Sequence, residues 1–385
     1  MEFLLPTYST GTLADVVPSL LAGLGVPGTS DVLGLPGAPR VCLLLVDGLG
    51  WELLRSHAAD APFLSSLAAE RDPITAGFPA TTATSLSTLG TGRPSGEHGM
   101  VGYSFAPDDN EVLNVLRWQR HGDGAHVDLR SQYVPEQIQP HRTVFEQAAD
   151  AGVEVRLVAP GAQDGSGLTR AVLRGGQFRG TYALGDLTTH VLDALSGHPR
   201  VLCYAYHADL DMLGHIYGAG STPWRAQLRY VDQLAATIAE GLPSDSMLVV
   251  TADHGMVNAG EQDRVDIDTE PALLDGVRML GGEARVRHVY TAQGAVEDVR
   301  RAWSEVLGER ALVLPRDEAI SAGWFGPRVD DRVRPRVGDL VVAALGSFVM
   351  VRSQAEPQLS LLPGQHGSLT REEQLVPLLT ATKDD

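Results

Sequence analysis

The chain contains little cysteine and no pattern that would make cysteine useful as a metal ligand. Only two of its 385 residues are cysteines, Cys42 and Cys203, and both lie in apolar runs typical of buried strands. No Cys-x-x-Cys pattern is present, so nothing indicates a cysteine-bound metal. We therefore expect two buried, reduced thiols.

Positive charge is also scarce. Lysine and arginine number 30 against 48 for aspartate and glutamate, which gives a formal net charge of −18. Such an excess of carboxylates argues against binding a nucleic acid polymer along its phosphate backbone. It leaves room for a small anionic substrate, because bound metal ions can invert the local electric field.

The sequence lacks a long uninterrupted apolar segment at its N-terminus. The stretch 1–28 has no basic start, and Pro6 and Pro18 interrupt its apolar residues. It fits neither a signal peptide nor a membrane-spanning helix. We expect a protein without a membrane span that works in the cytoplasm.

What the chain does have is a regular alternation of strand and helix patterns. Apolar runs typical of buried strands, each followed by a turn, lie at 41–51, 153–161, 200–211 and 246–255. Helical patterns lie between them, at 51–70, 143–152 and 225–242. This alternation predicts an α/β fold with a mostly parallel sheet covered on both faces, in which ligands bind beyond the carboxyl ends of the strands.

Two segments depart from this alternation. Residues 104–143 show little periodicity and are predicted to form a lid-like excursion. Residues 262–345 are predicted to form a small α+β insert, with strands at 284–292 and 311–315 around a helix at 294–308. No repeat, low-complexity tract or linker separates independent units, so we expect one domain over 1–385.

Five short segments place acids, histidines and a threonine where the chain leaves buried strands or enters turns. They contain Asp47, Thr82, the pair Asp211 and His215, the pair Asp253 and His254, and His366. Taken singly, most have an ordinary explanation, such as a helix cap, an i,i+4 pair on a helix or a loop residue. The pair at 253–254 is harder to dismiss, because it ends a very apolar run where buried charge is costly unless it is paired or metal-bound.

Taken together, these residues indicate metal binding. Three aspartates and three histidines are ligands that Zn²⁺ or Mn²⁺ take in proteins. Six ligands divide naturally into two sites of three, each with room for a nucleophile, water or substrate oxygen.

The order of the segments resembles that of the alkaline phosphatase superfamily, and most of all its nucleotide pyrophosphatase/phosphodiesterase branch. The resemblance covers about 40–370 and is carried by VDGLG, TGRPSGEHGM and TADHGMV. It implies an alkaline-phosphatase-like three-layer sandwich with a mostly parallel central sheet and a small α+β insert.

The resemblance also implies two metal sites. One ion would be held by Asp211, His215 and His366. The other would be held by Asp47, Asp253 and His254, with Thr82 as a further ligand. The histidine content of both sites favours zinc, with manganese as the alternative.

The same family pattern assigns the nucleophile. It lies nine residues before the threonine of the Thr-Gly pair, and counting back from Thr91 gives Thr82. Pro79, three residues earlier, also fits, and Thr81 is the alternative. The threonine- and serine-rich segment around Thr82 is also typical of the first turn of an N-capped helix. This is compatible with catalysis, because a helix N-terminus favours a nearby anion. An unassisted threonine hydroxyl needs such help.

One position departs from the family pattern. Many nucleotide pyrophosphatases have an asparagine three residues after the nucleophile, where it donates a hydrogen bond to a phosphate oxygen. Here the position is Ser85, which we expect to bind substrate with a shorter reach. Tyr103, Phe105, Trp118 and Tyr206 are candidates to contact a nucleobase, although core packing is the favoured interpretation of each.

The resemblance therefore implies hydrolysis of phosphodiester or pyrophosphate bonds in a small phosphorylated substrate, such as a nucleotide, through a phosphothreonine intermediate. A phosphomonoesterase is the main alternative, with Arg93 as the candidate for binding extra phosphate charge. A sulfatase is disfavoured because the segment around Thr82 lacks the Cys/Ser-x-Pro-x-Arg motif, and a phosphomutase of this superfamily typically uses serine. A non-catalytic metal-binding relict is the alternative from another class, but none of the seven positions is lost.

Overall fold

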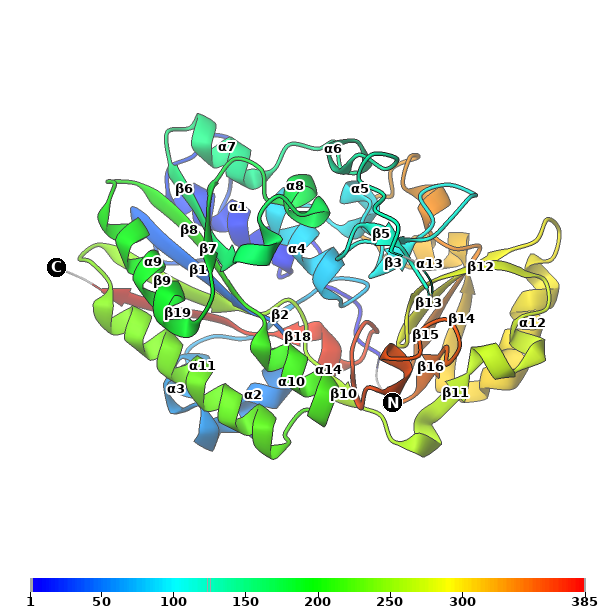
Figure 1. Cartoon of the computed structure of the whole chain (residues 1–385). Helices are drawn as coiled ribbons and strands as arrows, with labels where there is room; N and C mark the ends of the chain where they lie inside the picture. Colours follow the sequence, from blue (N-terminus) through cyan, green and yellow to red (C-terminus); the bar gives the residue numbers. More distant parts are fainter. Residues whose placement is uncertain (1–2, 123, 125, 384–385) are drawn as a thin grey trace.

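The structure is a computed structural model that describes residues 3–122, 124 and 126–383. It contains a six-stranded sheet and a four-stranded sheet that lie at opposite ends of the molecule (Figure 1). The six-stranded sheet has the order β19-β9-β1-β8-β6-β7. Its strands are β1 (Arg40–Val46), β6 (Glu154–Pro160), β7 (Gln177–Thr181), β8 (Val201–His207), β9 (Ser246–Thr251) and β19 (Leu378–Lys383).

Five strands of this sheet are parallel, and only β19 runs antiparallel, at one edge beside β9. The apolar runs are continuous because both faces of the sheet are covered, and every residue of β8 is buried. Cys42 and Cys203 are paired in register on β1 and β8, and both are buried free thiols. The predicted α/β class, mostly parallel sheet and reduced cysteines are confirmed.

Helices pack on both faces of the sheet, which gives three layers (Figure 1). One layer contains α1 (Leu13–Gly23), α4 (Thr82–Thr91), α7 (Val144–Asp150) and α8 (Gly167–Val172). The other contains α3 (Pro62–Ala68), α9 (Leu184–Ser196) and α11 (Thr222–Gly241). Near the sheet edge lie α2 (Trp51–Ser56), α10 (Asp209–Tyr217) and α14 (Arg371–Gln374).

The helical patterns at 143–152 and 225–242 correspond to α7 and α11. Thr143 caps α7 by accepting a hydrogen bond from the Glu146 N–H at 3.0 Å, and the Glu146 carboxylate accepts from the Thr143 N–H in return. The pattern at 51–70 was expected to be helical throughout, but the structure divides it into α2, a 3₁₀ turn at Ala58–Asp60 and α3. Pro62 starts α3 because its ring fits the first turn of a helix and not the interior.

The four-stranded sheet is antiparallel, in the order β12-β13-β15-β14. It comprises β12 (Val277–Glu283), β13 (Val286–Thr291), β14 (Ala311–Pro315) and β15 (Leu340–Ala344), with α12 (Val296–Leu307) and α13 (Arg316–Ser321) beside it. Val299, Trp303 and Leu307 form the buried stripe of α12 at a spacing of four residues. The expected helix and two strands are present in 262–345, and β12 and β15 are strands that the sequence analysis did not identify.

Short strands and helices join these parts. In and around 104–143 they are α5 (Ser95–His98), β3 (Ser104–Phe105), β4 (Leu113–Asn114), β5 (Gln119–Arg120) and α6 (Pro135–Ile138). Elsewhere they are β2 (Ile74–Thr75), β10 (Val257–Asn258), β11 (Arg264–Asp266), β16 (Val349–Val351), β17 (Gly364–Gln365) and β18 (Leu375–Val376). The roles of 104–143 as a lid and of 262–345 as an insert stay predictions.

Among the helices that the structure describes, none combines the length and the apolar character needed to cross a lipid bilayer. A location in the cytoplasm stays a prediction.

Candidate active site

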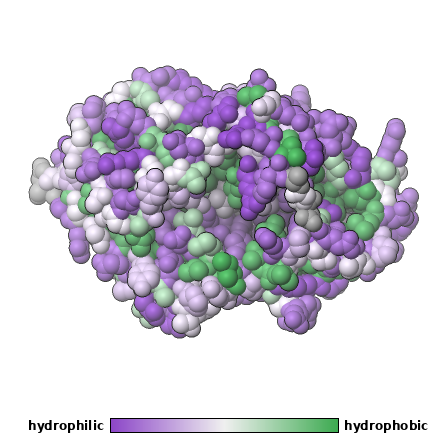
Figure 2. Space-filling model, viewed as in Figure 1, coloured by the Kyte–Doolittle hydropathy of each residue, from purple (hydrophilic) through white to green (hydrophobic). Residues whose placement is uncertain are grey.

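The predicted ligands meet at one edge of the six-stranded sheet, where β1, β8 and β9 end. Asp47 follows β1, Asp253 and His254 follow β9, and α10 after β8 carries Asp211 and His215. Gly48 permits this close approach, because it has a φ of +73° and a Cβ there would lie 2.9 Å from the Asp211 Cα atom. On the face seen in Figure 1, the space-filling view shows a hollow between the two sheets (Figure 2).

The first group consists of Asp47, Asp253 and His254, all buried. The His254 Nε2 atom lies 3.5 Å from Asp47 Oδ1 and 3.4 Å from Asp253 Oδ2. The other oxygen of each carboxylate is held by the protein. Asp253 Oδ1 accepts from the Gly48 N–H at 3.0 Å, and Asp47 Oδ2 accepts from the Tyr206 hydroxyl.

The second group consists of Asp211, His215 and His366. His215 Nε2 lies 3.3 Å from Asp211 Oδ2, as expected for an i,i+4 pair on α10. His366 Nε2 lies 3.2 Å from His215 Nε2 and 3.9 Å from Asp211 Oδ1. The His366 ring stacks on the His254 ring with centroids 3.5 Å apart, so the two groups adjoin.

All three imidazole rings are oriented by backbone carbonyl oxygens. The Nδ1 distances are 2.8 Å from His215 to Gly364, 2.9 Å from His254 to Gly255 and 3.0 Å from His366 to Ala80. These contacts assign the proton to Nδ1 in each neutral ring, which leaves the Nε2 lone pair directed at the carboxylates. Three Nε2 atoms therefore converge on the same space as the carboxylate oxygens.

One oxygen of each aspartate has no hydrogen-bond partner among the described residues. These buried atoms are Asp47 Oδ1, Asp211 Oδ1 and Asp253 Oδ2. Burial raises the pKa of Asp47 well above its usual range, and the neighbouring Asp253 and Asp211 charges add to the rise. Burial would lower the pKa of His215, but Asp211 outweighs it and raises that pKa to about 9. Carboxylate oxygens and imidazole nitrogens are the donor set that suits divalent metal ions, which displace the imidazole protons when they bind.

Thr82 lies at the first position of α4, beside the first group. Its Oγ1 atom is 3.2 Å from His254 Nε2. The hydroxyl of Thr81, the alternative nucleophile, instead donates to Glu283 Oε2 at 3.2 Å. The backbone N–H groups of Thr82, Ala83 and Thr84 make no hydrogen bond within the part of the chain that the structure describes. They are the free donors that an anion at a helix N-terminus can use.

The structure does not support the predicted substrate contact of Ser85. Its hydroxyl is buried and donates to the Asp253 backbone carbonyl at 2.7 Å. A serine hydroxyl has a single proton, so this donor is committed to the protein. Ser85 thus contributes to the position of Asp253, and the free N–H groups of α4 are the donors that face the site.

The other residues named in the sequence analysis lie outside the two groups. Phe105 and Trp118 are fully buried, as core packing predicts, and the Tyr206 ring is buried with its hydroxyl on Asp47. Tyr103 is partly exposed and lines a cavity of about 230 Å³ together with His121 and Glu356. Arg93 pairs with Glu97 at 2.6 Å.

Two residues beside the site were missed by the sequence analysis as parts of it. Tyr206 was considered only as an aromatic contact, and its place one strand away from Asp47 could be inferred only from strand register. Glu283 comes from β12 of the other sheet, and no local pattern signals its approach. Its Oε1 atom is buried without a partner among the described residues, and burial raises the pKa of Glu283 to about 8.

Comparison with known proteins agrees with the family resemblance found in the sequence. A family model described as "Type I phosphodiesterase / nucleotide pyrophosphatase" matches residues 41–369. The catalytic subunit of GPI ethanolamine phosphate transferase 3 from Mus musculus is 25% identical over 251 residues. That match covers 59% of this chain and 21% of the mouse protein, so the chain spans about a fifth of that relative's length.

Two solved structures share the fold. Inactive murine ectonucleotide pyrophosphatase/phosphodiesterase 5 in complex with AMP is 16% identical, with 90% of each chain covered and a TM-score of 0.65. Phosphonoacetate hydrolase from Sinorhizobium meliloti in complex with phosphonoacetate is 18% identical, with 89% of this chain and 90% of that one covered and a TM-score of 0.65. At these identities the likeness establishes the fold alone.

Proposed function

Because the chain belongs to the type I phosphodiesterase/nucleotide pyrophosphatase family of the alkaline phosphatase superfamily, we propose that it cleaves phosphodiester or pyrophosphate bonds with Thr82 as its nucleophile. One observation carries this proposal. The Thr82 hydroxyl lies at the start of a helix with free N–H groups, 3.2 Å from a histidine of the first ligand group. A nucleophile, ligands for a charge-neutralising ion and donors for phosphoryl oxygens thus meet at one place.

The two groups fit two divalent ions, with Zn²⁺ as the first choice and Mn²⁺ as the second. Asp211, His215 and His366 would hold one ion. Asp47, Asp253 and His254 would hold the other, together with Thr82 Oγ1. When bound, such ions lower the pKa of the threonine hydroxyl and neutralise the charge of the phosphoryl group and the leaving oxygen.

The residues of the chain perform the remaining tasks in two steps. Thr82 Oγ1 forms a bond to phosphorus while the bond to the leaving alcohol or phosphate breaks, and the threonine proton passes through solvent to the leaving oxygen. Water then attacks the phosphothreonine, which restores the threonine hydroxyl and releases the phosphorylated product. The N–H groups at the start of α4 hold a phosphoryl oxygen in both steps. Tyr206 and Ser85 keep Asp47 and Asp253 in place.

Diester or pyrophosphate cleavage is favoured over monoester cleavage. A monoester carries an additional negative charge, and Arg93 was the candidate to bind it. Its guanidinium is instead 2.6 Å from the Glu97 carboxylate. The names of the relatives suggest a range of substrates to test, since one neighbour binds AMP, another binds phosphonoacetate, and the curated relative is a phosphoethanolamine transferase. A non-catalytic relict is disfavoured, because all seven positions meet at one site.

The test is paired turnover of bis-p-nitrophenyl phosphate and p-nitrophenyl phosphate by the purified protein. Both reactions are measured after EDTA treatment and again after addition of Zn²⁺ or Mn²⁺. We expect faster cleavage of the diester, which EDTA abolishes and zinc restores. Faster monoester cleavage would favour the phosphatase alternative. Turnover that resists removal of every metal would contradict the mechanism. AMP esters, dinucleotides and phosphonoacetate form the second panel of substrates.

A further inference from the structure

Thr81 occupies the N-cap position of α4 but does not cap the helix. A threonine at this position usually accepts a hydrogen bond from the second or third N–H of its helix. Here the Thr81 side chain makes no such bond, although its backbone is extended, with φ −139° and ψ 147°, as an N-cap residue requires. Its hydroxyl donates instead to Glu283 Oε2, at 3.2 Å and 202 residues away in sequence.

Glu283 reaches Thr81 because the tip of the β12–β13 hairpin is fixed beside the loop that carries His366. Arg285, in the hairpin turn, binds Glu373 through Nε at 2.9 Å and through Nη2 at 2.7 Å, and both side chains are fully buried. The Glu373 carboxylate also accepts from the Ser368 N–H at 2.9 Å, so it joins the hairpin to the 366–370 loop. This is a bidentate, fully satisfied ion pair, which fixes geometry.

The Glu283 carboxyl group also packs closely against the loop that carries His366. Gly367 follows His366 with a φ of +136°, and a Cβ atom on it would lie 3.0 Å from Glu283 Oε1. The absence of a side chain at 367 leaves space for the carboxyl group beside the loop. Glu283 is therefore held between the nucleophile helix and the His366 loop by contacts on both sides.

We propose that Glu283 is a positioning residue that keeps the N-terminus of α4 open for a phosphoryl group by accepting the hydrogen bond of the Thr81 hydroxyl. Without Glu283, the Thr81 side chain can turn and accept from the Thr84 N–H, as N-cap threonines do. That bond would compete with a phosphoryl oxygen for the same donor. This inference rests on the proposed function and assigns to the four-stranded sheet an indirect part in binding the anion, through Thr81.

A rescue experiment tests the proposal. Inorganic phosphate binding to the zinc-loaded protein is measured by titration calorimetry for the wild type, Glu283→Ala, Glu283→Gln, Thr81→Val and the Glu283→Ala/Thr81→Val double variant. Glu283→Ala should weaken phosphate binding by about fivefold, the equivalent of one N-cap hydrogen bond. Valine cannot cap a helix, so the double variant should bind phosphate within about twofold of the wild type. Glu283→Gln, whose amide oxygen still accepts, should also bind like the wild type.

The controls separate this role from a structural one. Glu309→Ala removes an exposed carboxylate from the same part of the chain and should change nothing. Bound zinc and the melting temperature are measured for every variant. A double variant as weak as Glu283→Ala, a Glu283→Ala variant equal to the wild type, or loss of zinc in Glu283→Ala would each overturn the proposal.

Diester turnover by the wild type is measured separately. If the wild type binds phosphate but cleaves no ester, the proposed function fails while the phosphate titrations still decide the role of Glu283. If the wild type cleaves diesters and all variants bind phosphate equally, the proposed function stands and this inference falls. If the wild type neither binds phosphate nor cleaves esters, both are overturned.

Discussion

Buried acids have opposite environments in the two parts of the molecule. At the edge of the six-stranded sheet, Asp47, Asp211 and Asp253 each leave one buried oxygen without a partner among the described residues. Beside the four-stranded sheet, Glu356 and Glu373 are bound by the buried arginines Arg287 and Arg285.

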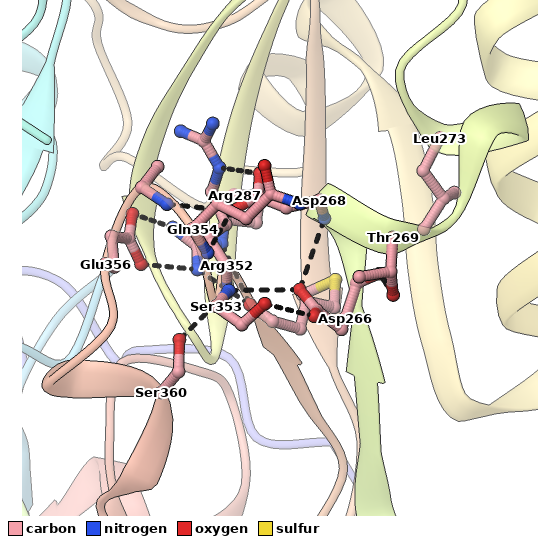
Figure 3. Close-up of polar contacts among 12 residues, drawn as sticks. Asp266, Asp268, Thr269, Leu273, Arg287, Arg352, Ser353, Gln354, Glu356 and Ser360 are labelled. Atoms are coloured by element: carbon pink, nitrogen blue, oxygen red, sulfur yellow. Dashed lines mark hydrogen bonds and ion pairs between the residues drawn. The ribbon is translucent and has the colours of Figure 1, made fainter. Parts of the chain in front are cut away.

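Beside the four-stranded sheet, the oxygens of these two buried glutamates have hydrogen-bond or ion-pair partners within the chain. Arg287 binds both oxygens of Glu356 at 2.8 Å, and His121 approaches the same carboxylate at 2.9 Å. Nearby, Asp268 accepts from Arg352 and from the backbone of Gln354, at 3.0 Å in each case. Figure 3 shows the hydrogen bonds and ion pairs that Glu356 and Asp268 make with neighbouring residues of the chain.

The difference lies in where the compensating cation comes from. A buried carboxylate is costly unless a cation or hydrogen-bond donors accompany it. Beside the four-stranded sheet the chain supplies arginine, and the acids serve its architecture. At the edge of the six-stranded sheet the neighbouring side chains are imidazoles and no arginine or lysine pairs with the three aspartates among the described residues, which suits the proposed binding of metal ions from solution. Burial of acids alone therefore does not indicate a metal site, whereas three buried carboxylates that converge with imidazole nitrogens do.

The largest effect is expected for the nucleophile. Thr82→Ala removes the only atom that can form the phosphothreonine, and kcat for the diester should fall by about a thousandfold or more. Zinc content and melting temperature should stay close to those of the wild type, since six ligands remain. If Thr82→Ala keeps more than a tenth of the wild-type rate, the assignment of the nucleophile is wrong.

Glu356→Gln tests the architectural side of the comparison. It leaves the buried Arg287 charge without its carboxylate, and breaking a buried ion pair of this kind costs about 3–5 kcal/mol. We expect a lower free energy of unfolding in urea, with zinc stoichiometry unchanged where the variant is folded. A loss of bound zinc without a loss of stability would reverse the roles assigned to the two regions.

His288 provides a test by pH in the same region. The ring is buried, its Nε2 donates to the Val101 carbonyl at 2.8 Å, and its Nδ1 accepts from the Gly338 N–H at 3.2 Å. Burial lowers the pKa of His288 to about 4, so the folded state favours the neutral ring. This stability is present above pH 6.5 and is lost as the pH falls toward 4, by about 3 kcal/mol in full.

The measurement is the free energy of unfolding of the metal-free protein between pH 7.5 and pH 4. Glu or Asp titration contributes in the same range, so the quantity of interest is the difference between the wild type and His288→Gln. The wild type should lose more stability than the variant on acidification. Identical pH dependence in the two proteins would show that His288 titrates as freely as in the unfolded chain.

The smallest expected effect is on the stability of the metal-free protein, and it is a stabilisation. Asp253→Asn removes a carboxylate whose charge repels that of Asp47, so it should stabilise the metal-free protein by about 1 kcal/mol while weakening zinc binding. Thermal unfolding with and without zinc measures both. Destabilisation of the metal-free form would mean that Asp253 serves the fold as Glu356 does.

Much of the site could be predicted because its signals are local. Apolar runs in the sequence predict the buried strands. Because these strands are parallel, Asp47 and Asp253 at their carboxyl ends lie at the same edge of the sheet. The i,i+4 spacing places Asp211 and His215 together on α10. The position of Thr82 required the family resemblance, since composition does not distinguish it from Thr81.

The remaining features depend on distant contacts. Glu283 meets Thr81 across 202 residues, through a hairpin whose docking depends on the Arg285–Glu373 pair. The family pattern located Ser85 but could not give the direction of its hydroxyl, which a nearby carbonyl decides. β12 and β15 were missed because their pairing with β13 is set by the sheet as a whole.

The central claim is that the carboxylates without partners at the edge of the six-stranded sheet receive two metal ions. Titration of the metal-free protein with zinc in a calorimeter tests it most directly, with Asp211→Asn and Glu356→Gln measured in parallel. The account predicts two zinc ions per chain for the wild type and for Glu356→Gln, and fewer than two tightly bound ions for Asp211→Asn. Less than one ion per wild-type chain, or equal loss of zinc in both variants, would contradict it.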